Sequence, residues 1–134
     1  MAEGEQNKGS RFAKSFRDLD AYQNALQLAA DVHKFCESLP DSERYVLANQ
    51  MRRASRSVCS NISEAWRKRR YKAAFVSKLS DSETEAAEMQ SWLDVAMKLQ
   101  YMPKETFDDF DHRYEHILAQ LIRMITDADK WCIL

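Results

Sequence analysis

Glycine and proline are nearly absent from this sequence of 134 residues. Its two glycines both fall within the first nine positions, and its two prolines are Pro40 and Pro103. Sheets and tight hairpins depend on glycine, asparagine and proline at their turns. A chain with so few of these residues is expected to form long helices joined by short connections, which argues against a β-rich fold.

Closely spaced cysteines and long apolar runs are missing as well. The three cysteines show no Cys-x-x-Cys spacing, and their odd number is typical of reduced thiols in a cytoplasmic protein. No apolar run approaches the ~18 residues of a membrane-spanning helix. Residues 1–15 are polar, lack the apolar core of a signal peptide and are expected to form a flexible tail. The sequence therefore predicts no membrane association.

The motifs of common enzyme classes are not present either. There is no Gly-x-Ser-x-Gly motif and no glycine-rich phosphate loop. His112 and His116 have helical metal-pair spacing, but both are expected to point away from the apolar seam of their helix. His33 is expected in the core or at an interface, and Asn61 and Glu64 as a buried polar pair that fixes helix register. We predict no catalytic residue, metal, cofactor or small-molecule substrate, and hence a non-enzymatic protein.

Apolar residues recur at spacings of three and four in several long segments, which is the pattern of amphipathic helices. The expected helices cover about residues 18–38, 43–68, 72–100 and 103–130. Pro40 ends the first helix, and Pro103 fits the first turn of the last one. The third helix carries a coiled-coil-like seam that Ser82 and Ala86 keep thin in the middle. Similar helix lengths and short connections predict an all-α, antiparallel up-down four-helix bundle over residues 16–134.

The first expected helix shows two apolar stripes, whereas a surface helix of a monomer usually shows one. The second stripe contains Leu28, Val32, Phe35 and Leu39. We interpret it, together with Trp92 on the third helix, as a surface that other copies of the chain cover. The two stripes therefore predict a homo-oligomer.

Charge is divided unevenly along the chain, although the net charge is only −1. Residues 44–78 contain ten Lys or Arg and one acidic residue, whereas residues 81–115 contain ten Asp or Glu and three basic residues. One interpretation is that the positive segment binds the phosphates of RNA or DNA, with Trp66 or Tyr71 stacking on unpaired bases. The other is that it pairs with the negative segment, within one chain or between neighbouring copies of a ring. The residues of the first interpretation, called the basic stripe below, are Arg52, Arg53, Arg56, Arg67, Lys68, Arg69, Arg70 and Lys72.

A set of residues spread over most of the chain carries a family resemblance. They are Phe16, Asp18, Leu19, Tyr22, Leu39-Pro40, Tyr45, Arg52-Arg53-Ala54, Ser57-Val58, Asn61-Ile62-Ser63-Glu64-Ala65, Phe75, Leu79, Ser82 and Glu85. With them, residues 16–126 resemble the four-helix-bundle proteins encoded by intervening sequences of bacterial large-subunit ribosomal RNA genes. The most specific part of the pattern is Arg-Arg-Ala followed by Asn-Ile-x-Glu, at residues 52–64.

The resemblance implies a bundle that assembles into a homopentameric ring, with no catalytic residue to carry over. More distantly, the chain resembles the accessory protein of diversity-generating retroelements, a pentameric barrel that binds nucleic acid and a reverse transcriptase. Cys59 stands where the family usually has proline, so the second helix is expected to be straighter. Ala65 stands where the family usually has glycine, which leaves the position of the turn between the second and third helices open. We expect an oligomeric scaffold or adaptor that contacts RNA or DNA through the basic stripe. The alternative is a purely structural protein–protein interaction module whose charges serve self-assembly.

Overall fold

The computed structural model describes residues 13–133 of the chain. All regular structure in this range is helical, which confirms the predicted all-α class. Residues 1–12 of the predicted tail lie outside the described residues. The long helices are α2 (Asp20–Cys36), α3 (Leu47–Arg67), α4 (Lys72–Lys98) and α5 (Lys104–Thr126). The short ones are the 3-10 helices η1 (Phe16–Asp18) and η2 (Asp41–Glu43) and the single turn α6 (Ala128–Trp131).

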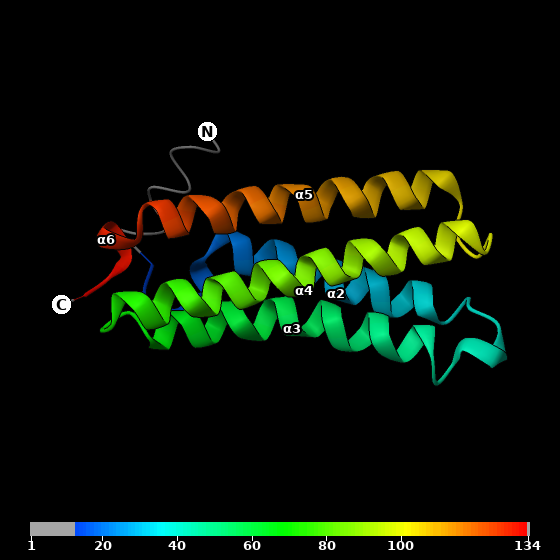
Figure 1. The fold of residues 1–134 in the computed structure, drawn as a ribbon, viewed down its shortest axis with the longest axis horizontal. Helices are drawn as coiled ribbons and strands as arrows, with labels where there is room; N and C mark the ends of the chain where they lie inside the picture. Colours follow the sequence, from blue (N-terminus) through cyan, green and yellow to red (C-terminus); the bar gives the residue numbers. More distant parts are fainter. Residues whose placement is uncertain (1–12, 134) are drawn as a thin grey trace.

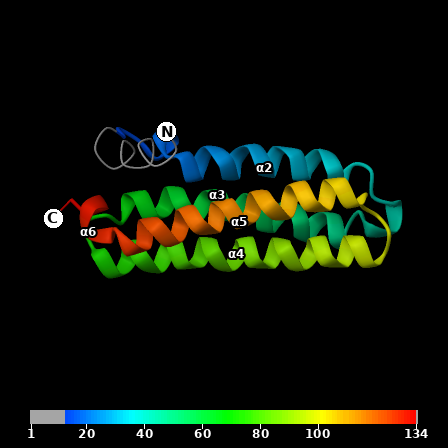
Figure 2. The same cartoon turned by 90° about the horizontal axis from the view of Figure 1, so that it is seen from above.

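The four long helices lie side by side along the long axis of the molecule, and the chain reverses direction from each one to the next (Figures 1 and 2). In sequence order each long helix packs against the next, and α5 returns to pack against α2. The α3–α4 turn and α6 lie at one end of the bundle, on the left of Figure 1. The α2–α3 and α4–α5 connections lie at the other end.

The seam of α4 faces the core along its length. Phe75, Leu79 and Leu93 have no exposed surface. Ser82, in the middle of the seam, is equally buried, and its hydroxyl donates to the backbone carbonyl of Val58 over 2.8 Å. This hydrogen bond requires the backbone of α3 to approach closely, which only a small side chain at position 82 allows.

The second apolar stripe of the first helix is not left for another chain. Leu28 and Val32 have no exposed surface, Leu39 is 9% exposed, and all belong to the core of their own chain. Phe35 is half-buried, with its ring edge-to-face against Phe110 of α5 at 6.3 Å between centroids. The stripe is covered because α2 packs against both α3 and α5. The prediction that Leu28, Val32 and Leu39 lie at an oligomer interface is therefore corrected: they are core residues.

Two helix boundaries differ from the expected ones. α3 begins at Leu47 and not near residue 43, because residues 41–43 form η2 and the Glu43 carboxylate accepts the backbone N–H of Leu47 over 3.3 Å. The last expected helix is divided at Asp127 into α5 and α6. By contrast, α3 continues without a break through Cys59 and Ala65, the positions that depart from the family pattern.

The C-terminus of α4 contains a residue in the left-handed region, Gln100, with φ of 61°. The N–H of Tyr101 donates to the carbonyl of Ala96 over 2.8 Å, which is the long hydrogen bond of a Schellman cap. Glycine adopts this conformation without steric cost. Gln100→Gly is therefore expected to raise the free energy of unfolding by about 0.5–1 kcal/mol, as measured by urea denaturation. Gln27→Gly, at an exposed position inside α2, is the control and should lower it; destabilisation by both would contradict the prediction.

Candidate nucleic-acid interface

The basic stripe follows the outer surface of α3 and continues into the turn before α4. Arg52, Arg53 and Arg56 lie in the first half of α3, and the other residues lie at its end, in the turn or, for Lys72, at the first position of α4. The opposite face of α3 carries the buried residues of its seam. At a rise of 1.5 Å per residue, Arg56 and Arg67 are about 16 Å apart along the helix. The stripe is thus two groups of cations on one side of the bundle.

Arg53 is held by α4 and does not face solvent freely. Its guanidinium forms ion pairs with the carboxylates of Glu85, at 3.4 Å, and Glu88. Glu85 also accepts from the Ser57 hydroxyl at 3.2 Å, and Glu88 from the indole N–H of Trp92 at 3.1 Å. This chain of polar contacts joins α3 to α4. It also places Trp92, a predicted interface residue, as a half-buried part of the contact within one chain.

Asn61 and Glu64 do not form the predicted polar pair. Asn61 is buried, and its amide donates to the carbonyl and hydroxyl oxygens of Ser57 at 2.9 and 3.1 Å. Glu64 is exposed and pairs with the ammonium of Lys78 at 3.0 Å. Asn61 therefore extends the polar contacts around Ser57, whereas Glu64 joins α3 to α4 at the surface.

Arg69 and Lys72 are also engaged by their own chain. The Arg69 guanidinium lies over the Trp66 ring, 3.5 Å from its centroid, and burial lowers its pKa. The Lys72 ammonium lies 2.8 Å from the carboxylate of Asp129, whose hydrogen bond and charge raise the pKa of this lysine. The backbone N–H of Ile133 donates to the carbonyl of Arg69 at 3.2 Å. Residues 128–133 thus hold the α3–α4 turn, and Trp66 is covered and not free to stack on a base.

Three cations of the turn remain exposed. Within residues 13–133, no acidic side chain forms an ion pair with Arg67, Lys68 or Arg70. Tyr71 beside them is 66% exposed. Free cations next to an exposed aromatic ring combine the two contacts that single-stranded nucleic acids make, phosphate pairing and base stacking.

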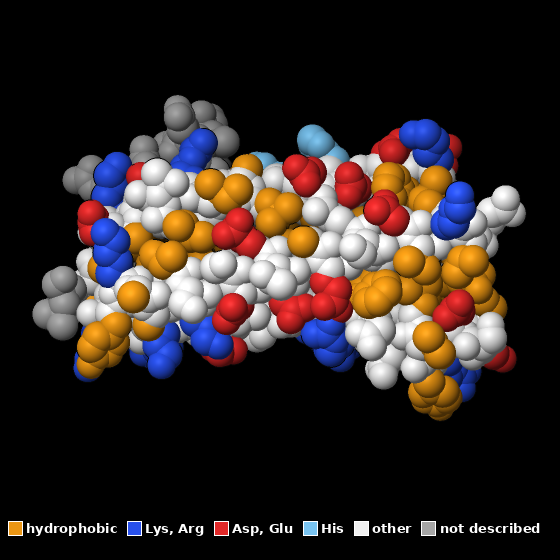
Figure 3. Space-filling view, in the orientation of Figure 1, with side chains coloured by type: hydrophobic (Ala, Val, Ile, Leu, Met, Phe, Trp, Pro, Cys, Tyr) orange, Lys and Arg blue, Asp and Glu red, His pale blue; other side chains and the backbone are white. Residues whose placement is uncertain are grey.

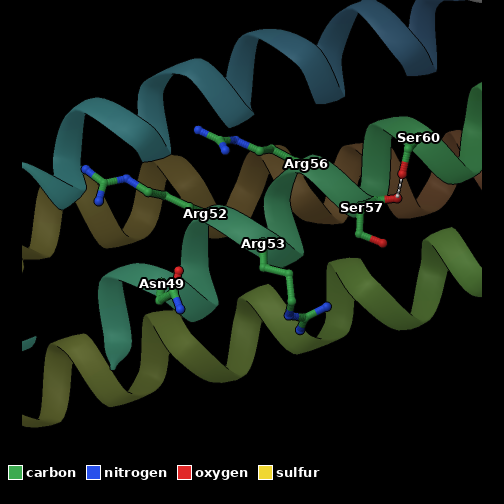
Figure 4. A pocket seen from close by; sticks show the side chains of 6 residues that line it. All are labelled: Asn49, Arg52, Arg53, Arg56, Ser57 and Ser60. Atoms are coloured by element: carbon green, nitrogen blue, oxygen red, sulfur yellow. Dashed lines mark hydrogen bonds between the residues drawn. The ribbon is translucent and has the colours of Figure 1, made fainter. Parts of the chain in front are cut away.

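Arg52 and Arg56, in the first half of α3, form a second group of cations without an ion pair in the described residues 13–133. Both extend toward α2, whereas Arg53 extends toward α4 (Figure 4). Nε of Arg52 donates to Nδ1 of His33 at 3.2 Å, and a terminal nitrogen of Arg56 lies 3.3 Å from the same atom. His33 is exposed in the single chain, so it is not a core residue, and its predicted place at an interface between copies stays a prediction. An open pocket of about 460 Å³ lies here, lined by Asn49, Arg52, Arg53, Arg56, Ser57 and Ser60.

Two cysteines lie near these residues but are poor nucleophiles. Burial raises the pKa of Cys36 to about 11, although the charges of Arg52 and Arg56 act in the opposite direction. Burial also raises the pKa of Cys59 to about 11. Because the thiolate is the reactive form of cysteine, the raised pKa values favour the less reactive thiol form of both side chains at neutral pH.

The other sequence candidates are not gathered into a site. His112 and His116 are both exposed on α5. Across residues 13–133, no group of three or more His, Cys, Asp or Glu side chains is placed to hold a metal ion. In the same range, no helix combines the length and apolar character needed to cross a membrane.

The family model of the 23S rRNA-intervening sequence protein matches residues 17–123. The chain belongs to the 23S rRNA-intervening sequence protein family. The match includes α3, α4 and the turn between them, so both groups of the basic stripe lie within the part shared with the 23S rRNA-intervening sequence proteins. The family resemblance inferred from the sequence is thereby confirmed.

A solved structure supports the fold of this 23S rRNA-intervening sequence protein. The crystal structure of a protein with unknown function from Bacteroides thetaiotaomicron, of the S23 ribosomal protein family, is similar with a TM-score of 0.72. The two sequences are 24% identical, and the similarity covers 79% of this chain and 95% of that chain. At this identity the likeness concerns the fold alone. No curated protein matches the chain significantly.

Proposed function

We propose that this protein is a non-enzymatic, oligomeric adaptor of the cytoplasm that contacts RNA or DNA through the unpaired residues of the basic stripe. The division of the stripe supports this function. Arg53, Arg69 and Lys72 are engaged by their own chain. The unpaired residues, which form no ion pair or ring contact within residues 13–133, are Arg52, Arg56, Arg67, Lys68 and Arg70. Attraction to the negative segment of the same chain thus accounts for only part of the positive segment.

The mode of contact follows from the residue types. Lysine and arginine pair with backbone phosphates irrespective of sequence, so the affinity depends on salt and little on base order. Tyr71 supplies an exposed ring on which one unpaired base can stack. We expect single-stranded or looped segments to bind more tightly than a regular duplex, because only they offer free base faces.

The proposal includes assembly of an antiparallel four-helix bundle into a ring, for which the family resemblance implies five copies. The surface that joins the copies differs from the one predicted. Exposed apolar side chains occur near the start of α3 and the end of α4 (Figure 3), namely Tyr45, Val46, Val95 and Leu99. A ring would repeat the unpaired cations on every copy, and the effective concentration of neighbouring sites would raise the overall affinity.

Gel-shift titration tests the proposed function directly. The probes are a single-stranded DNA and a structured RNA, each at about 50 and about 200 mM salt. Five phosphate contacts predict an affinity for single strands that falls about 100-fold over this range. Unchanged migration of both probes at the lower salt would end the proposal.

A purely structural interaction module is the second candidate. It is favoured by exposed acidic residues such as Glu37 and Asp94, for which residues 13–133 provide no ion-pair partner. In this case the unpaired cations would meet the acids of a neighbouring copy. Simultaneous substitution of Arg52, Arg56, Arg67 and Arg70 by glutamate distinguishes the candidates. Light scattering should show a smaller particle if the module is structural, and an unchanged mass with lost gel shift if nucleic acid is the partner.

A further inference from the structure

We infer that Arg52 and Arg56 form a site for a single phosphate group at the junction of α2 and α3, with His33 as its positioning residue. This inference deepens the proposed function, and it rests on that function for identifying nucleic acid as the source of the phosphate. Free inorganic phosphate carries the same chemistry.

The two guanidinium groups are brought together by the geometry of the helices. Arg52 and Arg56 are four residues apart, so they lie on the same face of α3, one turn from each other. Both reach the same nitrogen of His33, at 3.2 and 3.3 Å. The Nε–H of Arg52 donates to the single lone pair of Nδ1, and the terminal nitrogen of Arg56 lies beside the same atom. Two positive groups therefore converge on one side-chain atom.

The site keeps donors free for an anion. A guanidinium has five N–H donors, and the contact with His33 occupies no more than one on each arginine. The remaining N–H groups can bind phosphate oxygens in the paired geometry that arginine favours. Asn49 lines the same pocket, and its side chain makes no hydrogen bond within the described part of the chain. An amide at the rim can donate to a further phosphate oxygen.

Comparison with Arg53 shows that the site is more than a surface of like charges. Arg53 is adjacent to Arg52 in sequence, but Glu85 and Glu88 already neutralise it on the α4 side. On the α2 side, Glu37 lies one turn beyond His33 and forms no ion pair with either guanidinium in the described structure. The α2 side of the pocket thus has uncompensated positive charge, which an external anion can neutralise.

The position of the site also relates it to the cations of the turn. The distance of about 16 Å between Arg56 and Arg67 corresponds to about five phosphates of one strand in a stacked conformation. One strand that runs along α3 can therefore contact both groups. A footprint of this length is within the range that single-strand-binding domains occupy.

The experiment uses NMR of the His33 ring together with binding titrations of a short single-stranded oligonucleotide. Inorganic phosphate is expected to shift the His33 signals in a saturable way. Arg52→Gln with Arg56→Gln should abolish that shift and lower oligonucleotide affinity about tenfold or more. The matched control is Arg44→Gln with Lys98→Gln, which removes two exposed charges at the end of the bundle away from the turn and should cost less than about threefold.

The outcomes separate this site from the proposed function. If the oligonucleotide binds and the Arg52/Arg56 variant weakens it no more than the control pair, the phosphate site is overturned and the function stands. If inorganic phosphate shifts His33 and no oligonucleotide binds, the site stands with free phosphate as its ligand and the function is overturned.

The positioning role of His33 has its own readout. His33→Ala should weaken phosphate binding about threefold, because the two side chains are no longer held together. His33→Asn retains an amide acceptor near the place of Nδ1 and should restore most of the affinity. An equal loss in both variants would contradict the positioning role.

Discussion

Substitution of Arg67, Lys68 and Arg70 by glutamate is expected to weaken binding to single-stranded RNA or DNA by about 100-fold. The three side chains are exposed and have no acidic partner within residues 13–133, so their replacement leaves no buried group unsatisfied. Each phosphate contact contributes about 0.7 to the slope of log K against log salt for a single strand. The triple variant should therefore lose about two units of slope, which filter binding at several salt concentrations measures.

The matched control reverses the same number of charges at the opposite end of the bundle. It combines Arg44→Glu, Lys98→Glu and Lys104→Glu, in or beside the α2–α3 and α4–α5 connections. Salt at 0.1 M screens exposed charges beyond about 10 Å, so this variant should bind almost as the parent does. Equal losses in the two variants would show that net charge governs binding, and would contradict a contact at the turn.

Replacement of Leu28 by alanine is expected to lower the free energy of unfolding by about 3 kcal/mol. Leu28 has no exposed surface and lies in the core that α2 forms with its neighbours. The substitution removes buried apolar surface and leaves a cavity that the packed helices fill only in part. Urea denaturation followed by circular dichroism measures the change.

Leu26 provides the control for this experiment on the same helix. It is 45% exposed, and Leu26→Ala should cost less than about 1 kcal/mol. Repeating both measurements at several protein concentrations separates a core residue from an interface residue. Leu28→Ala could make the oligomer dissociate more easily and leave the stability of the dissociated chain unchanged. That result would contradict the assignment of Leu28 to the core.

The helical class and the buried seams could be predicted from the sequence because periodicity reports the face of a helix directly. Phe75, Leu79 and Ser82 lie in the core of the α4 seam as the spacing indicates. Periodicity does not tell which neighbour covers each apolar face of a helix. Two apolar stripes on α2 fit either a partner chain or a helix packed between α3 and α5, and only the three-dimensional arrangement separates the two.

The residues of the basic stripe could be proposed from the sequence, but the partner of each cation could not. Arg52 and Arg53 are adjacent in sequence, yet they extend to different helices because successive residues are about 100° apart around the axis. Which group each one meets depends on the rotation of α3 against α2 and α4. His33 and Asp129, the partners from α2 and α6, could not be identified for the same reason: no local pattern marks a contact between distant segments.

The contacts between residues 128–133 and the residues at the α3–α4 turn have a consequence for protein synthesis. Asp129 contacts Lys72, and the N–H of Ile133 reaches the carbonyl of Arg69. Because chains grow from the N-terminus, the helices on both sides of the turn leave the ribosome before these contacts can form. A nascent chain therefore presents the ammonium of Lys72 as an additional free cation to nearby polyanions, until Asp129 has been synthesised and pairs with it.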